Sequence, residues 1–168
     1  MTWFADPHLD LLRGLTIAQL TFLEGLAERR YFERDHIILA EGASQDRVFL
    51  LKSGRVRLEM NVPGRGRTTI LTLGPGDLLA FSALIGNSVM TATAVAEEPV
   101  EAISFDGVQL RAACDADHEL GYRLMSELAE TLSRRLVATR LQLLDLFRNS
   151  GDTRTQSVSS ADNHGPAS

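Results

Sequence analysis

The sequence predicts a mainly β fold with flanking helices, and three features of the chain lead to this prediction. Short β-rich apolar runs, separated by glycine-containing turns, recur through the middle of the chain. A helical spacing of leucines precedes them, and a longer helical pattern follows them. At 168 residues the chain has the length of one domain with its own core. We therefore expect a sandwich or barrel placed between helices.

The N-terminal residues 1–32 are predicted to form short helices. Their leucines recur three to five residues apart, as one buried face of a helix requires. Thr16 is suited to cap the second of these helices, because its hydroxyl can accept a hydrogen bond from a free backbone N–H. The leucines concerned are Leu12, Leu15, Leu20, Leu23 and Leu26.

Residues 33–106 are predicted to form the β-rich body of the domain. The clearest strand covers 56–62, where Val56 and Leu58 alternate with Arg57 and Glu59. Such alternation is typical of a strand with one buried face. Further strands are expected at 48–51, 68–73, 91–95 and 100–105.

Residues 107–148 are predicted to form a hinge and a long C-terminal helix. From about 117 to 147 there is no proline or turn cluster, and a leucine recurs every four residues at Leu120, Leu124 and Leu128. Asp115 or Asp117 is suited to cap this helix. A second apolar stripe follows heptad spacing, at Met125, Ala129, Leu132, Leu136, Thr139, Leu143 and Leu146.

The heptad stripe predicts a homodimer formed through the C-terminal helix. Heptad seams pair with a second helix, and two identical chains would meet around a two-fold axis. The alternative is that both apolar stripes pack on the chain's own β structure. The tail at 149–168 has almost no apolar residues, so we expect it to be disordered.

The charge balance argues against direct DNA binding. The chain has 17 Lys and Arg against 22 Asp and Glu, a formal net charge of −5. Nucleic-acid-binding domains carry a basic patch or stripe, which this composition does not supply.

No catalytic or metal site is expected. The four histidines, His8, His36, His118 and His164, are scattered along the sequence without ligand spacing. No nucleophile–base pair or group of convergent carboxylates stands out. We therefore predict that the chain is not an enzyme and requires no cofactor.

The chain is expected to be a soluble, cytoplasmic protein. No apolar run approaches the ~20 residues of a membrane span. Residues 1–6 lack the basic start and apolar core of a secretory signal. The lone cysteine, Cys114, has no internal partner and is interpreted as a small buried apolar residue near the hinge.

Four segments stand out by their order and their turns: ILAEG at 38–42, DRVFLL at 46–51, GRVRL at 54–58 and LGPGD at 73–77. Together they resemble the cyclic-nucleotide-binding domain family, as found in catabolite-activator-like proteins. The likeness extends from about residue 9 to 147 and includes glycines at the family's turns. It implies a double-stranded β-helix, or jelly-roll, β-roll. It also implies a stand-alone member without a helix-turn-helix, since only the polar tail follows residue 147.

The family's phosphate-binding cassette is divergent in this chain. By the resemblance, Ala80 stands where the family has Gly, Phe81 where it has the ribose-binding Glu, and Met90 where it has the phosphate-binding Arg. A charge-assisted hydrogen bond contributes about 1.5–3 kcal/mol. Losing one anchor is therefore expected to weaken cAMP binding roughly ten- to a hundredfold.

A ligand site is nevertheless expected at the cassette. Backbone N–H groups at Ser82, Ala83 and Leu84 and the hydroxyl of Thr91 remain as donors to an anion. Phe81 can stack on a base or line an apolar cavity. Arg134, Arg135 or Arg140 of the long helix could supply the missing charge. The predicted ligand-binding residues are Leu79, Ala80, Phe81, Ser82, Ala83, Leu84, Met90, Thr91 and Ala92.

Two functions follow from these alternatives. In the first, the chain is a sensor that binds a cyclic nucleotide, cAMP or a related small anion, and transmits binding through the C-terminal helix. In the second, Phe81 and Met90 fill the pocket, and the chain is a ligand-free protein-interaction or dimerisation module. The volume enclosed beside Phe81 and Met90 distinguishes the two.

Overall fold

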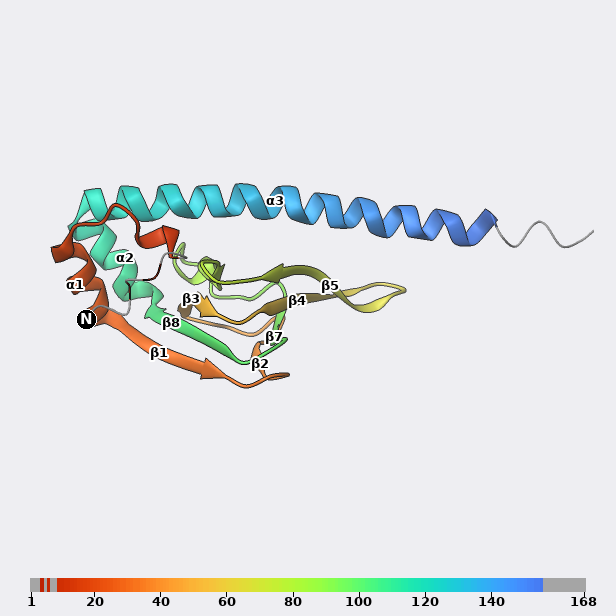
Figure 1. Cartoon of the computed structure of the whole chain (residues 1–168), viewed down its shortest axis with the longest axis horizontal. Helices are drawn as coiled ribbons and strands as arrows, with labels where there is room; N and C mark the ends of the chain where they lie inside the picture. The colour runs from red at the N-terminus through yellow and green to blue at the C-terminus, as the bar shows by residue number, and fades with distance from the viewer. Residues whose placement is uncertain (1–3, 5, 7–8, 156–168) are drawn as a thin grey trace, which may run out of the picture.

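The computed structural model describes residues 4, 6 and 9–155, and within these the chain forms a β-roll flanked by helices (Figure 1). Three helices and a 3-10 turn surround eight strands in the described part of the chain. A second 3-10 turn lies within the roll. The elements are η1 Asp10–Leu12, α1 Ile17–Leu26, β1 Ala27–Phe32, β2 Ile37–Leu39, β3 Arg47–Ser53, β4 Val56–Val62, β5 Gly66–Leu73, β6 Leu78–Leu79, η2 Phe81–Ala83, β7 Thr93–Ala96, β8 Val100–Asp106, α2 Gly107–Ala116 and α3 His118–Thr155.

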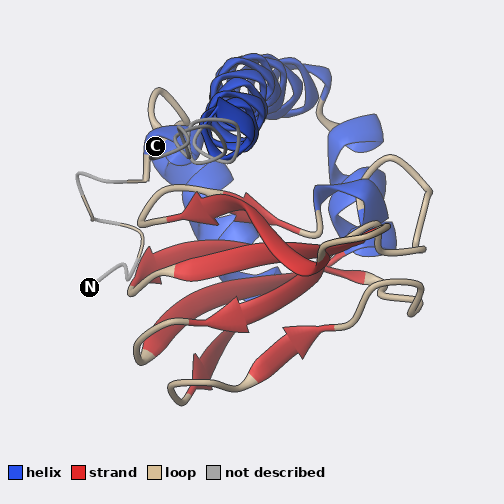
Figure 2. Ribbon diagram, turned by 90° about the vertical axis from the view of Figure 1, so that its right-hand side faces the viewer, coloured by secondary structure: helices blue, strands red, loops and turns tan. Residues whose placement is uncertain are grey.

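The strands form two four-stranded antiparallel sheets. One sheet has the order β1-β8-β3-β6 and the other β2-β7-β4-β5. Figure 2 shows the strands layered beneath α3. The crossovers between the sheets give the jelly-roll arrangement, which confirms the predicted fold class. Strand β4 has the bounds predicted from its alternating residues.

The N-terminal boundary of the roll differs from the prediction. Residues 27–32 were assigned to the helices but form β1, which pairs with β8 from Ala27↔Phe105 to Phe32↔Val100. The four central residues of β1 are all exposed. An edge strand with no buried face has no apolar alternation, so the pattern could not reveal it. The predicted cap of α1 is confirmed, because the Thr16 and Gln19 side chains form a capping box.

The C-terminal region contains two helices. Asp106 caps α2, because its carboxylate accepts a hydrogen bond from the Gln109 N–H at 2.9 Å. Asp117 caps α3 in the same way and accepts from the Leu120 N–H at 3.0 Å. Helix α3 continues to Thr155, so residues 149–155 are helical where a disordered tail was expected. Once a helix is nucleated, most polar residues lower its stability by only a fraction of a kcal/mol each. A polar composition alone therefore does not end α3. The rest of the predicted tail, 156–168, lies outside the described residues.

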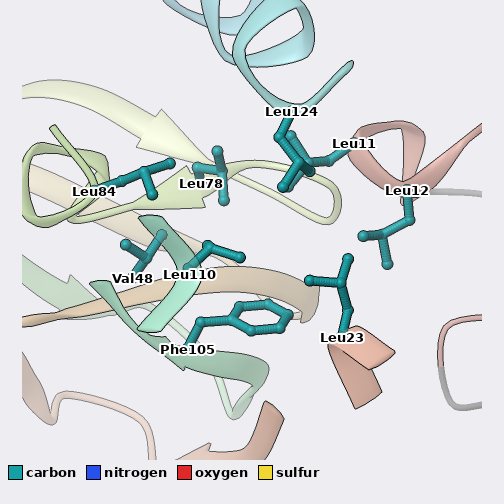
Figure 3. A pocket seen from close by; sticks show the side chains of 9 residues that line it. All are labelled: Leu11, Leu12, Leu23, Val48, Leu78, Leu84, Phe105, Leu110 and Leu124. Atoms are coloured by element: carbon teal, nitrogen blue, oxygen red, sulfur yellow. The ribbon is translucent and has the colours of Figure 1, made fainter. Parts of the chain in front are cut away.

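The first half of α3 is fixed to the roll by a leucine-rich core. Leu120, Leu124 and Leu128 are buried, which confirms the predicted stripe. Figure 3 shows Leu124 of α3 facing residues of η1, α1, α2 and the roll around a void of about 20 Å³. A second apolar cluster fills the space between the sheets. Beyond these contacts α3 runs along β5 and extends past the end of the roll (Figure 1).

Candidate ligand-binding cassette

A cavity of about 270 Å³ lies between the cassette and α3. Its wall is mostly apolar, with a few polar groups on the cassette and one charged side chain from α3. Seven of the nine residues predicted from the sequence line it. The full lining is Leu39, Leu58, Leu79, Ala80, Phe81, Ser82, Ile85, Asn87, Val89, Met90, Thr91, Ala92 and Arg135.

The cassette turns sharply between β6 and η2. Ala80 adopts a left-handed backbone conformation with φ of 60°. This conformation costs a residue with a Cβ roughly 1–2 kcal/mol, and glycine avoids most of that strain. The turn therefore keeps the geometry that a glycine would favour, although an alanine occupies it. It places the Phe81 ring at the cavity.

The 3-10 turn η2 uses two of the three backbone donors that we expected to face a ligand. The N–H of Ala83 donates to the Ala80 carbonyl at 3.1 Å, and the N–H of Leu84 donates to the Phe81 carbonyl at 2.9 Å. Among the described residues, no hydrogen bond engages the N–H of Ser82. Ser82 is thus the backbone donor of this turn that is left for an anion.

Ala83 and Leu84 are also absent from the cavity wall. The Leu84 side chain is buried in the leucine-rich core, where it lines the same void as Leu78 and Val48 (Figure 3). The Ala83 carbonyl lies against Gly107, where an added Cβ would come within 2.8 Å of its oxygen. These two residues connect the cassette to the start of α2, so the structure gives them a packing position.

Met90 and Phe81 form walls of the cavity and leave it open. Met90 is only 6% exposed and belongs to the core between the sheets. Its backbone is fixed by two hydrogen bonds, from its N–H to the Ala43 carbonyl and from the Gly42 N–H to its own carbonyl. The Phe81 ring is partly exposed at the other side, next to α3.

Arg135 is the charged residue at the cavity. Its Cζ lies 5.6 Å from the centre of the Phe81 ring, and its Nη2 donates to the Leu78 carbonyl. Its Nε is buried with no hydrogen-bond partner. Burial lowers the pKa of the Arg135 guanidinium, an effect that the negative charge of Asp77 opposes.

Of the three arginines considered from the sequence, the structure brings only Arg135 to the cavity. Arg134 points to Glu130 on the exposed side of α3, with 3.9 Å between Nη1 and Oε2. Arg140 is exposed. Arg135 lies seven residues, or about two helical turns, after the buried Leu128, so it falls on the same side of α3 as the buried leucines.

Two other classes of site find no support in the described residues. No group of three or more His, Cys, Asp or Glu residues is arranged to hold a metal ion there. None of the described helices combines the length and apolar character that crossing a membrane requires. Helix α3 has the length, but charged residues are distributed along it.

The comparisons with known proteins agree with this architecture. A family model described as "Cyclic nucleotide-binding domain" matches residues 29–117. A "CRP-like cAMP-activated global transcriptional regulator" of Mycobacterium tuberculosis is 33% identical over 117 residues, covering 69% of this chain and 50% of that protein. The chain thus spans about half the length of this curated relative.

Solved structures support the same fold. A cyclic nucleotide-binding domain from Methylobacillus flagellatus superposes with a TM-score of 0.73 at 20% identity, covering 82% of this chain and 80% of that one. The catabolite activator protein of Thermus thermophilus has a TM-score of 0.65 at 26% identity, covering 81% of this chain and 63% of that one.

Proposed function

Since this chain belongs to the cyclic nucleotide-binding domain family, we propose that it is a sensor module whose cassette cavity binds a nucleotide or a related small anion. The ligand lies between the cassette and α3, and α3 carries the response to a second copy of the chain. The proposal includes no catalytic step.

The open cavity beside Phe81 and Met90 is the observation that carries this proposal. Its volume of about 270 Å³ is close to the lower end of the roughly 300–1,000 Å³ that is usual for small-molecule pockets. A ligand-free interaction module would have these two side chains filling the interior. The cavity therefore favours the sensor over that alternative.

The relatives favour a cyclic nucleotide as the first ligand class to test. The M. tuberculosis relative is described as cAMP-activated. Phe81 and Met90 replace both charged anchors of the family's cassette, so we expect the pocket to be tuned to a different member of this ligand class or to a similar small anion.

The exposed apolar residues of α3 support a homodimer. Part of the predicted seam lies against the roll, where Leu132 packs on the leucine-rich core. Leu146 is half-buried. Leu136 and Leu143 are 53% and 44% exposed on the free side of the helix, and Phe147 is 73% exposed where α3 has passed the roll. A stripe of large apolar side chains on an extended helix is typical of a helix that pairs with another.

Thermal melts with a ligand panel test the sensor. The panel consists of cyclic mononucleotides and cyclic dinucleotides. A ligand present at a hundred times its Kd should stabilise the chain by ~2.7 kcal/mol. Ala92→Phe places a ring in the cavity and should abolish the shift, whereas the matched variant Ala112→Phe, on the exposed side of α2, should keep it. No shift with any member of the panel would favour the ligand-free module.

A further inference from the structure

We propose that Arg135 binds the negative charge of the ligand, and that the ligand is a small amphipathic monoanion with an apolar or aromatic body. This inference rests on the proposed function, because it concerns the same cavity. It assigns the charged contact to α3, whereas the family resemblance placed that contact at position 90 of the cassette.

The wall of the cavity contains a single positive charge. Arg135 is the one charged residue in the lining of this cavity, and the other polar members are Ser82, Asn87 and Thr91. One guanidinium can neutralise one negative charge, and it binds carboxylate or phosphate oxygens through two parallel hydrogen bonds. A ligand with several charges would leave the remaining ones without a partner against apolar walls.

The Arg135 guanidinium lacks a full set of hydrogen-bond partners. A guanidinium has five N–H donors, and burying it without partners is unfavourable. The Leu78 carbonyl accepts from Nη2, while the buried Nε has no partner. No ion pair involves Arg135 among the residues that the structure describes. An anion in the cavity would supply the opposite charge that the described residues do not provide to this guanidinium.

The neighbouring arginine provides an internal contrast. Arg134 has an exposed side chain and pairs with Glu130 one turn away, as surface arginines of a helix commonly do. Arg135 is instead turned to the cavity and lies over the Phe81 ring. Arg134 thus faces solvent and Arg135 faces the cavity, although they are adjacent arginines. The same substitution at each position gives a matched pair of variants.

The apolar wall defines the rest of the ligand. Leu39, Leu58, Leu79 and Met90 line the cavity, and Phe81 adds an aromatic ring to its wall. Aromatic faces and a thioether favour a flat, apolar guest. A cyclic phosphodiester of a nucleoside and an aromatic carboxylate both match this description, since each has one negative charge on a flat body.

The position of Arg135 also explains how binding can reach α3. Arg135 contacts the cavity from the helix itself, 17 residues after the helix begins at His118. A ligand that binds its guanidinium has a higher affinity for the helix position in which Arg135 reaches the cavity. Differential affinity of this kind shifts a conformational equilibrium.

The experiment is a titration calorimetry series with named probes and three variants. The monoanionic probes are cyclic AMP, cyclic GMP and benzoate, and adenosine is the uncharged control. Arg135→Gln removes the charge but keeps a donor for the Leu78 carbonyl, Arg135→Lys keeps the charge, and Arg134→Gln is the matched control. Melts without ligand check that each variant is folded.

We expect at least one monoanion to bind the native chain and to bind Arg135→Gln roughly ten- to a hundredfold more weakly. Arg135→Lys should recover part of the loss, and Arg134→Gln should bind as the native chain does. The probe that binds shows whether the anionic group of the ligand is a phosphodiester, as in cyclic AMP and cyclic GMP, or a carboxylate, as in benzoate. Equal binding of that anion to native chain and Arg135→Gln overturns this inference alone. Failure of every probe to bind the folded native chain overturns the monoanion assignment, and the melts with cyclic dinucleotides then test the proposed function separately.

Discussion

The Arg135 guanidinium of α3 lies over the Phe81 ring of the cassette, with 5.6 Å between Cζ and the ring centre. This contact joins the helix to the segment that lines the cavity. Phe81 stands where the family resemblance places an acidic residue. A glutamate at this position would lie next to Arg135 and compete with an anionic ligand for it. The aromatic residue leaves the positive charge available.

Restoring the family's arginine should strengthen binding of cyclic nucleotides. Met90→Arg adds a charge-assisted contact for a phosphodiester, which should tighten cyclic AMP binding about tenfold or more in a calorimetric titration. Because Met90 is buried, the same change should lower the melting temperature. Met60→Arg, on β4 and outside the lining of the cavity, should leave the affinity unchanged. Equal affinities for Met90→Arg and the native chain would show that position 90 does not contact the phosphate.

Leu84 should matter for stability, with little effect on the ligand. It is 5% exposed in the leucine-rich core, so Leu84→Ala should lower the free energy of unfolding by about 2–5 kcal/mol in urea denaturation. Ile85→Ala is the control, because Ile85 is 58% exposed and its truncation should stay within about 0.5 kcal/mol. A stability loss at Ile85 as large as that at Leu84 would contradict this assignment.

The exposed seam of α3 should determine the oligomeric state. The double variant Leu136→Glu, Leu143→Glu places two charges in the proposed helix pair and should convert a dimer to a monomer. Light scattering on a sizing column measures the mass. Val108→Glu, at an equally apolar exposed site on α2, should remain dimeric. A native chain that is monomeric throughout the accessible concentration range would refute the helix pairing.

Asp117 should make the stability depend on pH. Its hydrogen bonds, first with the Gln19 side chain and then with the Leu120 N–H, hold the pKa of its carboxyl below the usual value. A lowered pKa in the folded state means that the stabilisation is present above the unfolded pKa of about 4 and is lost as the pH falls through the folded value.

Asp117→Ala should therefore melt below the native chain at pH 7, and the difference should shrink at pH 3. Asp115→Ala, an exposed aspartate two residues earlier, is the control and should change the melting temperature little. A difference between native chain and Asp117→Ala that is the same at both pH values would mean that the charged carboxylate is not the stabilising species.

The parts of the fold that the sequence predicted are those in which apolar residues recur at a regular spacing. The alternation at 56–62 identified β4, and the leucine stripe at Leu120, Leu124 and Leu128 identified the face of α3 that packs on the roll. Strand β1 was missed because it is an exposed edge strand, with no buried face to generate a pattern.

Seven of the nine cassette residues named from the sequence line the cavity, and ligand binding there stays a prediction. Local sequence could place the cassette but could not show that η2 turns Leu84 into the core and uses two backbone donors. Arg135 is distant from the cassette in sequence, and three arginines of the long helix were equal candidates. Only the tertiary packing of α3 selects among them.

Methyl NMR of the methionines tests the central claim most directly, since the chain has four and Met90 lies in the cavity wall. Titration with cyclic AMP, cyclic GMP and benzoate should move the Met90 signal along a saturable curve with at least one of them. The Met60 signal should stay in place, because Met60 does not line this cavity. A Met90 signal that none of the three moves, in a chain that stays folded, would contradict the account.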